Sequence, residues 1–176
     1  MGLTASDYVY MLPNRCNYSY FLMTPKTHAR AAAAVVAATC ACFNIRKAAR
    51  AVTQFYDDAL RPSGLRITQF TLLVLLQGHG AMTINSLADA AGTDRTTLTR
   101  NLALLEERRL VRIRTGEDAR ERIVELTAAG ERAAAAAFPM WQKAQTRVAT
   151  ELGQHRLTRL LSDLSATVGA VGAETP

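Results

Sequence analysis

Arginines and short hydroxyl side chains between positions 95 and 122 are the residues best suited to chemistry in this sequence. An Arg guanidinium can form paired hydrogen bonds with a phosphate or with the edge of a guanine. The chain of 176 residues carries 21 Lys and Arg against 15 Asp and Glu, a net charge of +6, and only three basic residues are Lys. This balance suits nucleic acid or an anionic membrane surface, although a GC-rich genome would also favour Arg over Lys.

A helix predicted from Asp94 to about Arg109 would place some of these residues on a common face. At 100° per residue, three leucines share its inward side, and the residues opposite them are short or basic. The inward residues are Leu98, Leu102 and Leu105. The opposite side and the first turn hold the candidate contacts with phosphates or base edges, namely Arg95, Thr96, Thr99 and Arg100. Such a face suits a DNA major groove.

A second, shorter helix is predicted over Ile84–Ala91, directly before the first. Two helices that cross near a right angle need a small residue at their contact and a turn residue that tolerates positive φ. Ala88 and Gly92, four residues apart, meet these two needs. The span from Ile84 to Arg109 therefore has the layout of a helix-turn-helix.

A β-hairpin is predicted next, because two short β-branched runs, at 111–113 and 123–126, flank the polar segment Thr115–Glu121. Gly116 and Asp118 supply its tip turn, and Asp118 is expected to hold Arg120 or an Asx turn in shape. Arg120 at the tip could enter a narrow minor groove. Six arginines crowd around this hairpin: Arg108, Arg109, Arg112, Arg114, Arg120 and Arg122. Of these, Arg112, Arg114 and Arg122 are expected to contact DNA together with Arg120.

The flanking segments predict a fold that is mainly α with a small β-hairpin wing. Residues 1–25 have no helical period and are expected to form a disordered or loosely attached arm, with Met23 as an alternative translation start. One long helix is predicted from Thr27 to Leu60, ended by Pro62 and Gly64. The remaining predicted helices are Gln69–Gln77, capped by Thr68; Ala128 to about Glu151, kinked or restarted at Pro139; and Leu157–Val168.

Two motifs resemble the wing of the multiple-antibiotic-resistance regulator (MarR) family, which reads Asp-x-Arg and then Leu-Thr-x-x-Gly. They are Gly-Glu-Asp-Ala-Arg-Glu-Arg at 116–122 and Val-Glu-Leu-Thr-Ala-Ala-Gly at 124–130, both following the helix-turn-helix. The resemblance covers about residues 40–168. It matches Asp118 and Arg120 to the family's wing pair, and it places Thr96, Thr97 and Arg100 on the family's recognition helix.

The resemblance implies a homodimeric winged helix-turn-helix protein that binds a pseudo-palindromic operator in double-stranded DNA. Such proteins are usually repressors, released by a small-molecule or peroxide effector. A single domain at 26–176 is then expected, with the winged helix-turn-helix at about 66–127. The dimerisation helices would be about 27–61 and 128–170, which agrees with an apolar stripe too large for one small winged domain to cover: Leu157, Leu160, Leu161, Leu164 and Val168.

A second resemblance concerns Cys42 and Tyr56. In the organic-hydroperoxide-sensing branch of the family, a Cys-Phe pair near the start of the first helix is followed fourteen residues later by a Tyr that hydrogen-bonds the thiol. Cys42-Phe43 and Tyr56 keep this spacing, whereas Ile67 stands where the branch has a second Tyr. Cys42 is thus either a redox sensor or a small packing residue, the commoner case.

Other classes of function find little support in the residues. The three His are scattered, no Gly-rich phosphate loop is present, and no enzyme, cofactor or metal is expected. Cys40 and Cys42 lie about 200° apart on an intact helix and cannot bond there. No run of 18 apolar residues occurs, so a cytoplasmic protein with no membrane partner is expected. A winged-helix adaptor that binds proteins is the alternative, but it would need no Arg at the wing tip.

Overall fold

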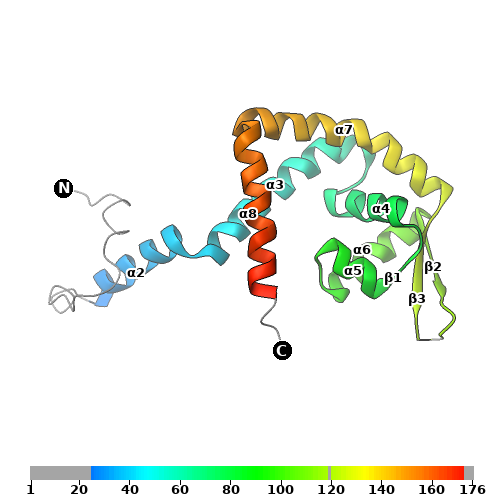
Figure 1. Cartoon of the computed structure of the whole chain (residues 1–176), viewed down its shortest axis with the longest axis horizontal. Coiled ribbons are helices and arrows are strands. Elements are labelled where there is room, and N and C mark those ends of the chain that lie inside the picture. Colours follow the sequence, from blue (N-terminus) through cyan, green and yellow to red (C-terminus); the bar gives the residue numbers. More distant parts are fainter. Residues whose placement is uncertain (1–24, 119, 173–176) are drawn as a thin grey trace. The chain divides into compact units, whose positions relative to one another are not determined.

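The computed structural model describes residues 25–118 and 120–172, and it divides into two compact units that meet after Thr53 (Figure 1). Each unit is described separately. In chain order the elements are α2 (Pro25–Thr39), α3 (Ala41–Leu60), the 3₁₀ turn η2 (Arg61–Ser63), α4 (Ile67–His79), β1 (Met82–Thr83), α5 (Ile84–Ala91), α6 (Arg95–Glu107), β2 (Val111–Thr115), β3 (Arg122–Leu126), α7 (Ala128–Leu152) and α8 (Gln154–Gly172).

The first unit contains α2 and most of α3, separated by a break at Cys40. The Thr39 hydroxyl donates to the Val35 carbonyl over 2.8 Å, and the Asn44 amide donates to the carbonyls of Ala37 and Cys40 over 3.1 and 3.0 Å. Side chains that bond to helix carbonyls in this way bend helices. The prediction of one uninterrupted helix from 27 to 60 is therefore wrong.

No single helix within the described residues is long and apolar enough to cross a membrane. The segments Ala29–Thr39 and Ala41–Ser63 meet that requirement only when taken together, across a bend of 61°. Residues 1–24, which contain Cys16 and all but the last residue of the predicted arm, lie outside the described residues.

The second unit is built on a three-stranded antiparallel sheet in the order β1-β3-β2. The predicted hairpin is β2–β3, with Val111 opposite Leu126 and Thr115 opposite Arg122; the short strand β1 was not predicted. The three inward leucines predicted for α6 are all fully buried. They belong to one apolar core with α4 and α5, whose largest fully buried members include Leu60, Leu73, Leu76, Leu87 and Val124.

Helix α4 begins earlier than predicted. Its first residue is Ile67, and Thr68 is an exposed helical residue rather than the cap. The Ile67 N–H donates to the Asp57 carboxylate over 2.7 Å, and the Arg66 N–H donates to the Gln69 side chain over 3.1 Å. The start of α4 is thus capped by Gln69 within the helix and by Asp57 of α3, ten residues back, and local sequence rules do not detect the second of these.

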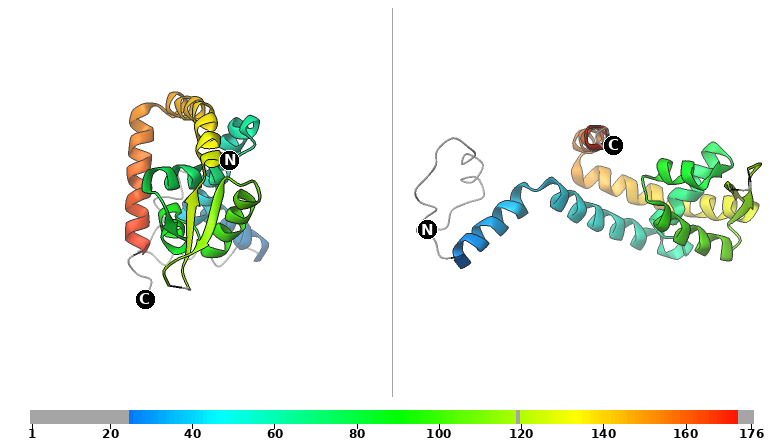
Figure 2. Two further views of the ribbon diagram at one scale, coloured as in Figure 1. Left: turned by 90° about the vertical axis from the view of Figure 1, so that its right-hand side faces the viewer. Right: turned by 90° about the horizontal axis from the view of Figure 1, so that it is seen from below.

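Helices α7 and α8 form a corner at the end of the second unit (Figures 1 and 2). Helix α7 contains Pro139 but continues through it, so the predicted restart is wrong, although the helix changes direction along its length in Figure 1. At the corner, Gly153 has φ +82°, a conformation that favours glycine. Helix α8 is longer at both ends than predicted.

Candidate nucleic-acid interface

The turn between α5 and α6 sets the start of the candidate recognition helix. Gly92 has φ +60°, and its N–H donates to the carbonyls of Ala88 and Asp89. Asp94 then caps α6 by accepting a hydrogen bond from the Thr97 N–H over 2.9 Å. Hydrogen bonds from the side chain and the backbone of Thr97 hold the pKa of Asp94 below its ordinary value.

The outward face of α6, defined here as Thr96, Arg100 and Ala103, is exposed to solvent. Arg95 and Thr97 in the first turn are also exposed. Thr99 is exposed, but its hydroxyl donates to the Arg95 carbonyl over 2.7 Å, so only its oxygen lone pairs remain available. The face can therefore present one guanidinium, hydroxyls and a methyl group to a ligand, which are the groups that read base edges.

The arginines of the hairpin project from both faces of the sheet. Arg112 and Arg114 lie on the face that also carries Glu125, whereas Arg122 pairs with Thr115 on the other face. Arg114 forms an ion pair with Glu125, and Arg122 Nη1 donates to the Thr115 hydroxyl over 3.4 Å. Arg112 is exposed and takes part in no ion pair within the described part of the chain.

The tip of the hairpin is closed by Asp118. Its carboxylate accepts from the Arg120 N–H over 2.8 Å, which is an Asx turn, and its carbonyl accepts from the Glu121 N–H over 2.9 Å. The Gly116 N–H donates to the Glu121 carbonyl over 2.9 Å. Asp118 thus shapes the turn through the backbone, and Arg120 beside it is exposed. The end of the β2–β3 hairpin lies remote from α7 (Figure 1).

The base of the hairpin is joined to α7 by the Leu-Thr-x-x-Gly motif. Thr127 caps α7 by accepting from the Gly130 N–H over 3.0 Å, and its hydroxyl lies 2.7 Å from the Arg109 carbonyl and 3.1 Å from the Leu110 carbonyl. A Cβ on Gly130 would lie 2.1 Å from the Leu110 oxygen. The motif therefore requires glycine at 130, because the hairpin backbone passes directly over the first turn of α7.

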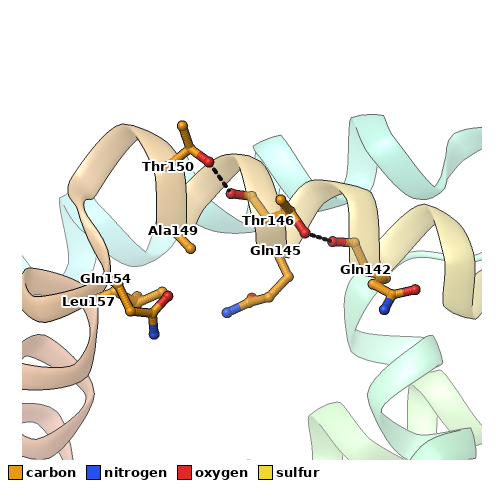
Figure 3. Close-up of a pocket in the computed structure, with 7 residues that line it drawn as sticks. All are labelled: Gln142, Gln145, Thr146, Ala149, Thr150, Gln154 and Leu157. Carbon is orange, nitrogen blue, oxygen red and sulfur yellow. Dashed lines mark hydrogen bonds between the residues drawn. The ribbon is translucent and has the colours of Figure 1, made fainter.

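The corner of α7 and α8 encloses an open polar hollow of about 530 Å³ that sequence reasoning missed (Figure 3). Figure 3 shows the Gln145 side chain projecting into it. The oxygen of the same amide accepts a hydrogen bond from the Tyr56 hydroxyl, and burial raises the pKa of Tyr56. Among the described residues the hollow is lined by uncharged side chains: Gln142, Gln145, Thr146, Ala149, Thr150, Gln154 and Leu157.

The two candidate redox residues lie on α3. Cys42 is exposed, Cys40 is partly buried at the break, and both are free thiols. Fourteen residues of one helix span about 21 Å, so a bond between Cys42 and Tyr56 would require a second chain. Because the helix is interrupted at Cys40, the separation of about 200° between the two thiols no longer applies. No group of three metal-ligating side chains occurs among the described residues.

Comparison with known proteins identifies the family. Residues 63–121 match the MarR family, a span that runs from the end of η2 to the tip of the hairpin. The M. tuberculosis transcriptional regulator MosR, whose crystal structure in complex with DNA is known, is 42% identical in sequence to this chain. The two structures superpose with a TM-score of 0.67, and the match covers 76% of this chain and 98% of the MosR chain. The chain belongs to the MarR family.

Two further relatives extend this assignment. The uncharacterized HTH-type transcriptional regulator YwoH of Bacillus subtilis (strain 168) is 34% identical over 88 residues, which are 50% of this chain and 64% of the length of YwoH. A mutant E. coli MarR complexed with operator DNA shares the fold alone, at 20% identity and a TM-score of 0.64 over 70% of this chain and 90% of that one. The small antiparallel sheet with the β2–β3 hairpin agrees with the wing of this winged-helix fold.

Proposed function

We propose that this MarR-family chain is a DNA-binding transcriptional regulator that inserts the outward face of α6 into a major groove and the tip of β2–β3 into the adjacent minor groove. The observation that supports this most is the joint exposure of Arg100 on α6 and Arg112 and Arg120 on the hairpin, none of them in an ion pair within the described chain. A helix N-terminus beside Arg95 adds a site for a phosphate. The proposed DNA contacts are Arg95, Thr96, Thr97, Thr99, Arg100, Arg112, Arg120 and Arg122, with Asp118 shaping the tip and Arg114 stabilising the sheet.

We propose further that the protein acts as a homodimer, in a single domain completed by α2 and α3 together with residues 128–170. Large apolar side chains of α8 are exposed, with Leu161 53% and Val168 70% accessible, and α3 exposes Phe43 and Val52. Such side chains stabilise a second chain when they are covered. The hollow at the α7–α8 corner is lined in part by α8, the helix that exposes Leu161 and Val168, so we expect the partner to cover it. A monomer in sedimentation at micromolar concentration would contradict this.

Sequencing the DNA that the protein selects from a random duplex pool tests the proposed function. A two-fold symmetric dimer predicts enrichment of an inverted repeat whose half-sites are about 10 base pairs apart. A selected pool without any shared sequence would contradict operator binding, and an affinity with no salt dependence would favour a protein-binding adaptor.

Repression relieved by an effector is the mode of regulation that we propose, with two candidate triggers. The first is a hydroperoxide acting on Cys42, whose exposure meets one requirement of a sensor thiol. The second is a planar apolar molecule that packs on the half-exposed Phe138 and the adjacent Trp141.

Treating the operator complex with organic hydroperoxide separates these triggers. A thiol sensor predicts release by the oxidant, recovery with reductant, and a Cys42→Ser variant that binds DNA but ignores the oxidant. Release that persists in Cys42→Ser would place the sensor at another residue. A parent protein that ignores hydroperoxide would leave Cys42 as a packing residue and favour the small-molecule trigger.

A further inference from the structure

Arg108, at the end of α6, is one of the six clustered arginines and is exposed, yet its guanidinium bonds to the backbone of a distant turn of the same chain. Its Nη1 donates to the Gly64 carbonyl over 2.8 Å. A Cβ placed on Gly64 would lie 3.4 Å from Arg108 Nη2, so the guanidinium rests against this glycine. Gly64 also has φ +72°, a second reason for glycine at this position.

The turn that Arg108 contacts is firmly attached to α3 and α4. The Ser63 hydroxyl donates to the Leu60 carbonyl over 2.6 Å and accepts from the Leu65 N–H over 3.2 Å. Leu60 and Leu65 are buried in the core, and Asp57 of α3 caps α4. The turn is therefore a junction of three helices, in which the side chain of Arg108 connects the end of α6 to the end of α3.

The end of α6 is also held from the hairpin side, where the Ile113 N–H donates to the Glu106 carboxylate and Leu105 and Leu110 are buried, so Arg108 supplies its attachment on the α3 side. Arg109 follows with φ +57°, and its N–H donates to the Glu106 carbonyl, which closes α6. A rigid helix pinned at its C-terminal end presents its outward face at a fixed angle, and small errors in that angle misplace base contacts. The loss of the hydrogen bond from Arg108 to Gly64 would weaken contacts with bases more than the attraction to phosphates, because that attraction depends only weakly on the orientation of the helix.

We infer that Arg108 is a positioning residue, which fixes the angle of the recognition helix through Gly64 and does not itself contact DNA. This inference rests on the proposed function.

The test compares Arg108→Met with Arg112→Met, in which an exposed hairpin arginine of equal charge is removed. Affinities for the selected operator and for a random duplex are measured between low and high salt. Arg108→Met should lower operator affinity about tenfold, leave random-duplex affinity and the salt slope unchanged, and keep the parent's thermal melting. Arg112→Met should weaken both affinities and reduce the slope by about one. Arg108→Lys should recover part of the operator preference, because an ammonium can still donate to the Gly64 oxygen.

Two results would overturn the inference. A salt slope that falls by about one in Arg108→Met would identify Arg108 as a phosphate contact. An unchanged ratio of operator to random affinity in a folded Arg108→Met would show that the Gly64 bond has no part in readout. If the parent protein selects no operator, the proposed function itself is contradicted. That result is obtained with the parent alone, before any variant is compared.

Discussion

At the base of the β2–β3 hairpin, backbone and side-chain groups are satisfied within the chain, whereas the arginines at its tip and on α6 point to solvent. Thr127 bonds both α7 and the Arg109–Leu110 backbone, and the Ile113 N–H donates to Glu106. Arg120 and Arg100 are exposed and belong to no ion pair in the described residues. One Arg-rich segment therefore holds two kinds of arginine: some bond to other groups of the chain and stabilise the fold, and others remain available to a partner.

The base of the hairpin should be the part most sensitive to substitution. Gly130→Ala places a Cβ about 2 Å from the Leu110 oxygen, so we expect a loss of about 3 kcal/mol in the free energy of unfolding, measured in urea. Gly78→Ala in α4 is the matched control, because its Cβ would meet nothing within 4 Å and a helical alanine is favoured. Equal stabilities for the two variants would show that the hairpin does not press on α7.

The outward face of α6 should be sensitive in binding but not in folding. Arg100→Ala is expected to cost about 2 kcal/mol in affinity for the selected operator and to relax base choice, because one bidentate base contact is lost. Its melting temperature should equal the parent's, since the side chain is exposed. Unchanged affinity and base preference would remove Arg100 from the interface.

Thr127 offers a smaller test of the hairpin base. Thr127→Val keeps the shape of the side chain but removes the cap of α7 and the bond to the Arg109–Leu110 backbone, so stability should fall by about 1 to 2 kcal/mol. Thr127→Ser, which retains the hydroxyl, should recover most of this loss in the same urea titration. A valine variant as stable as the serine variant would contradict the role of the hydroxyl.

The smallest expected effect is the pH dependence of the α6 cap. The folded pKa of Asp94 is lowered by its bonds to Thr97, so its contribution is present above its ordinary pKa and is lost as the pH falls through the folded value. Asp94→Asn keeps a capping side chain that does not titrate. The stability difference between parent and variant, measured by urea unfolding from pH 7 to pH 2, should therefore shrink toward low pH. A difference that grows on acidification would contradict this sign.

Much of the winged domain could be predicted because its pattern is local. Leucines at helical spacing fixed the inward side of α6, and two β-branched runs located the hairpin. The break at Cys40 was missed because it arises from Thr39 and Asn44 side chains that compete for helix carbonyls, a preference weaker than helical periodicity. The start of α4 was missed because part of its cap, Asp57, lies on another helix.

The sequence predicted which segment carries the candidate interface, but it did not predict which of its arginines bond within the chain and which are available to a ligand. Arg108 and Arg114 belong to the same crowded segment as Arg112 and Arg120, and nothing in their spacing shows that one contacts Gly64 and the other Glu125. Such partners depend on how separate elements pack. The residue types of a segment can thus predict that it binds polyanions. Which of its side chains remain available depends on the residues that pack against the segment in the fold.

The central claim is that the exposed wing tip binds DNA and the paired arginine beside it does not. The most direct measurement is the salt dependence of operator affinity for the parent, Arg120→Met and Arg114→Met. We expect a steep slope for the parent, a slope smaller by about one for Arg120→Met, and the parent's slope for Arg114→Met. A reduced slope in Arg114→Met with an unchanged slope in Arg120→Met would contradict this claim.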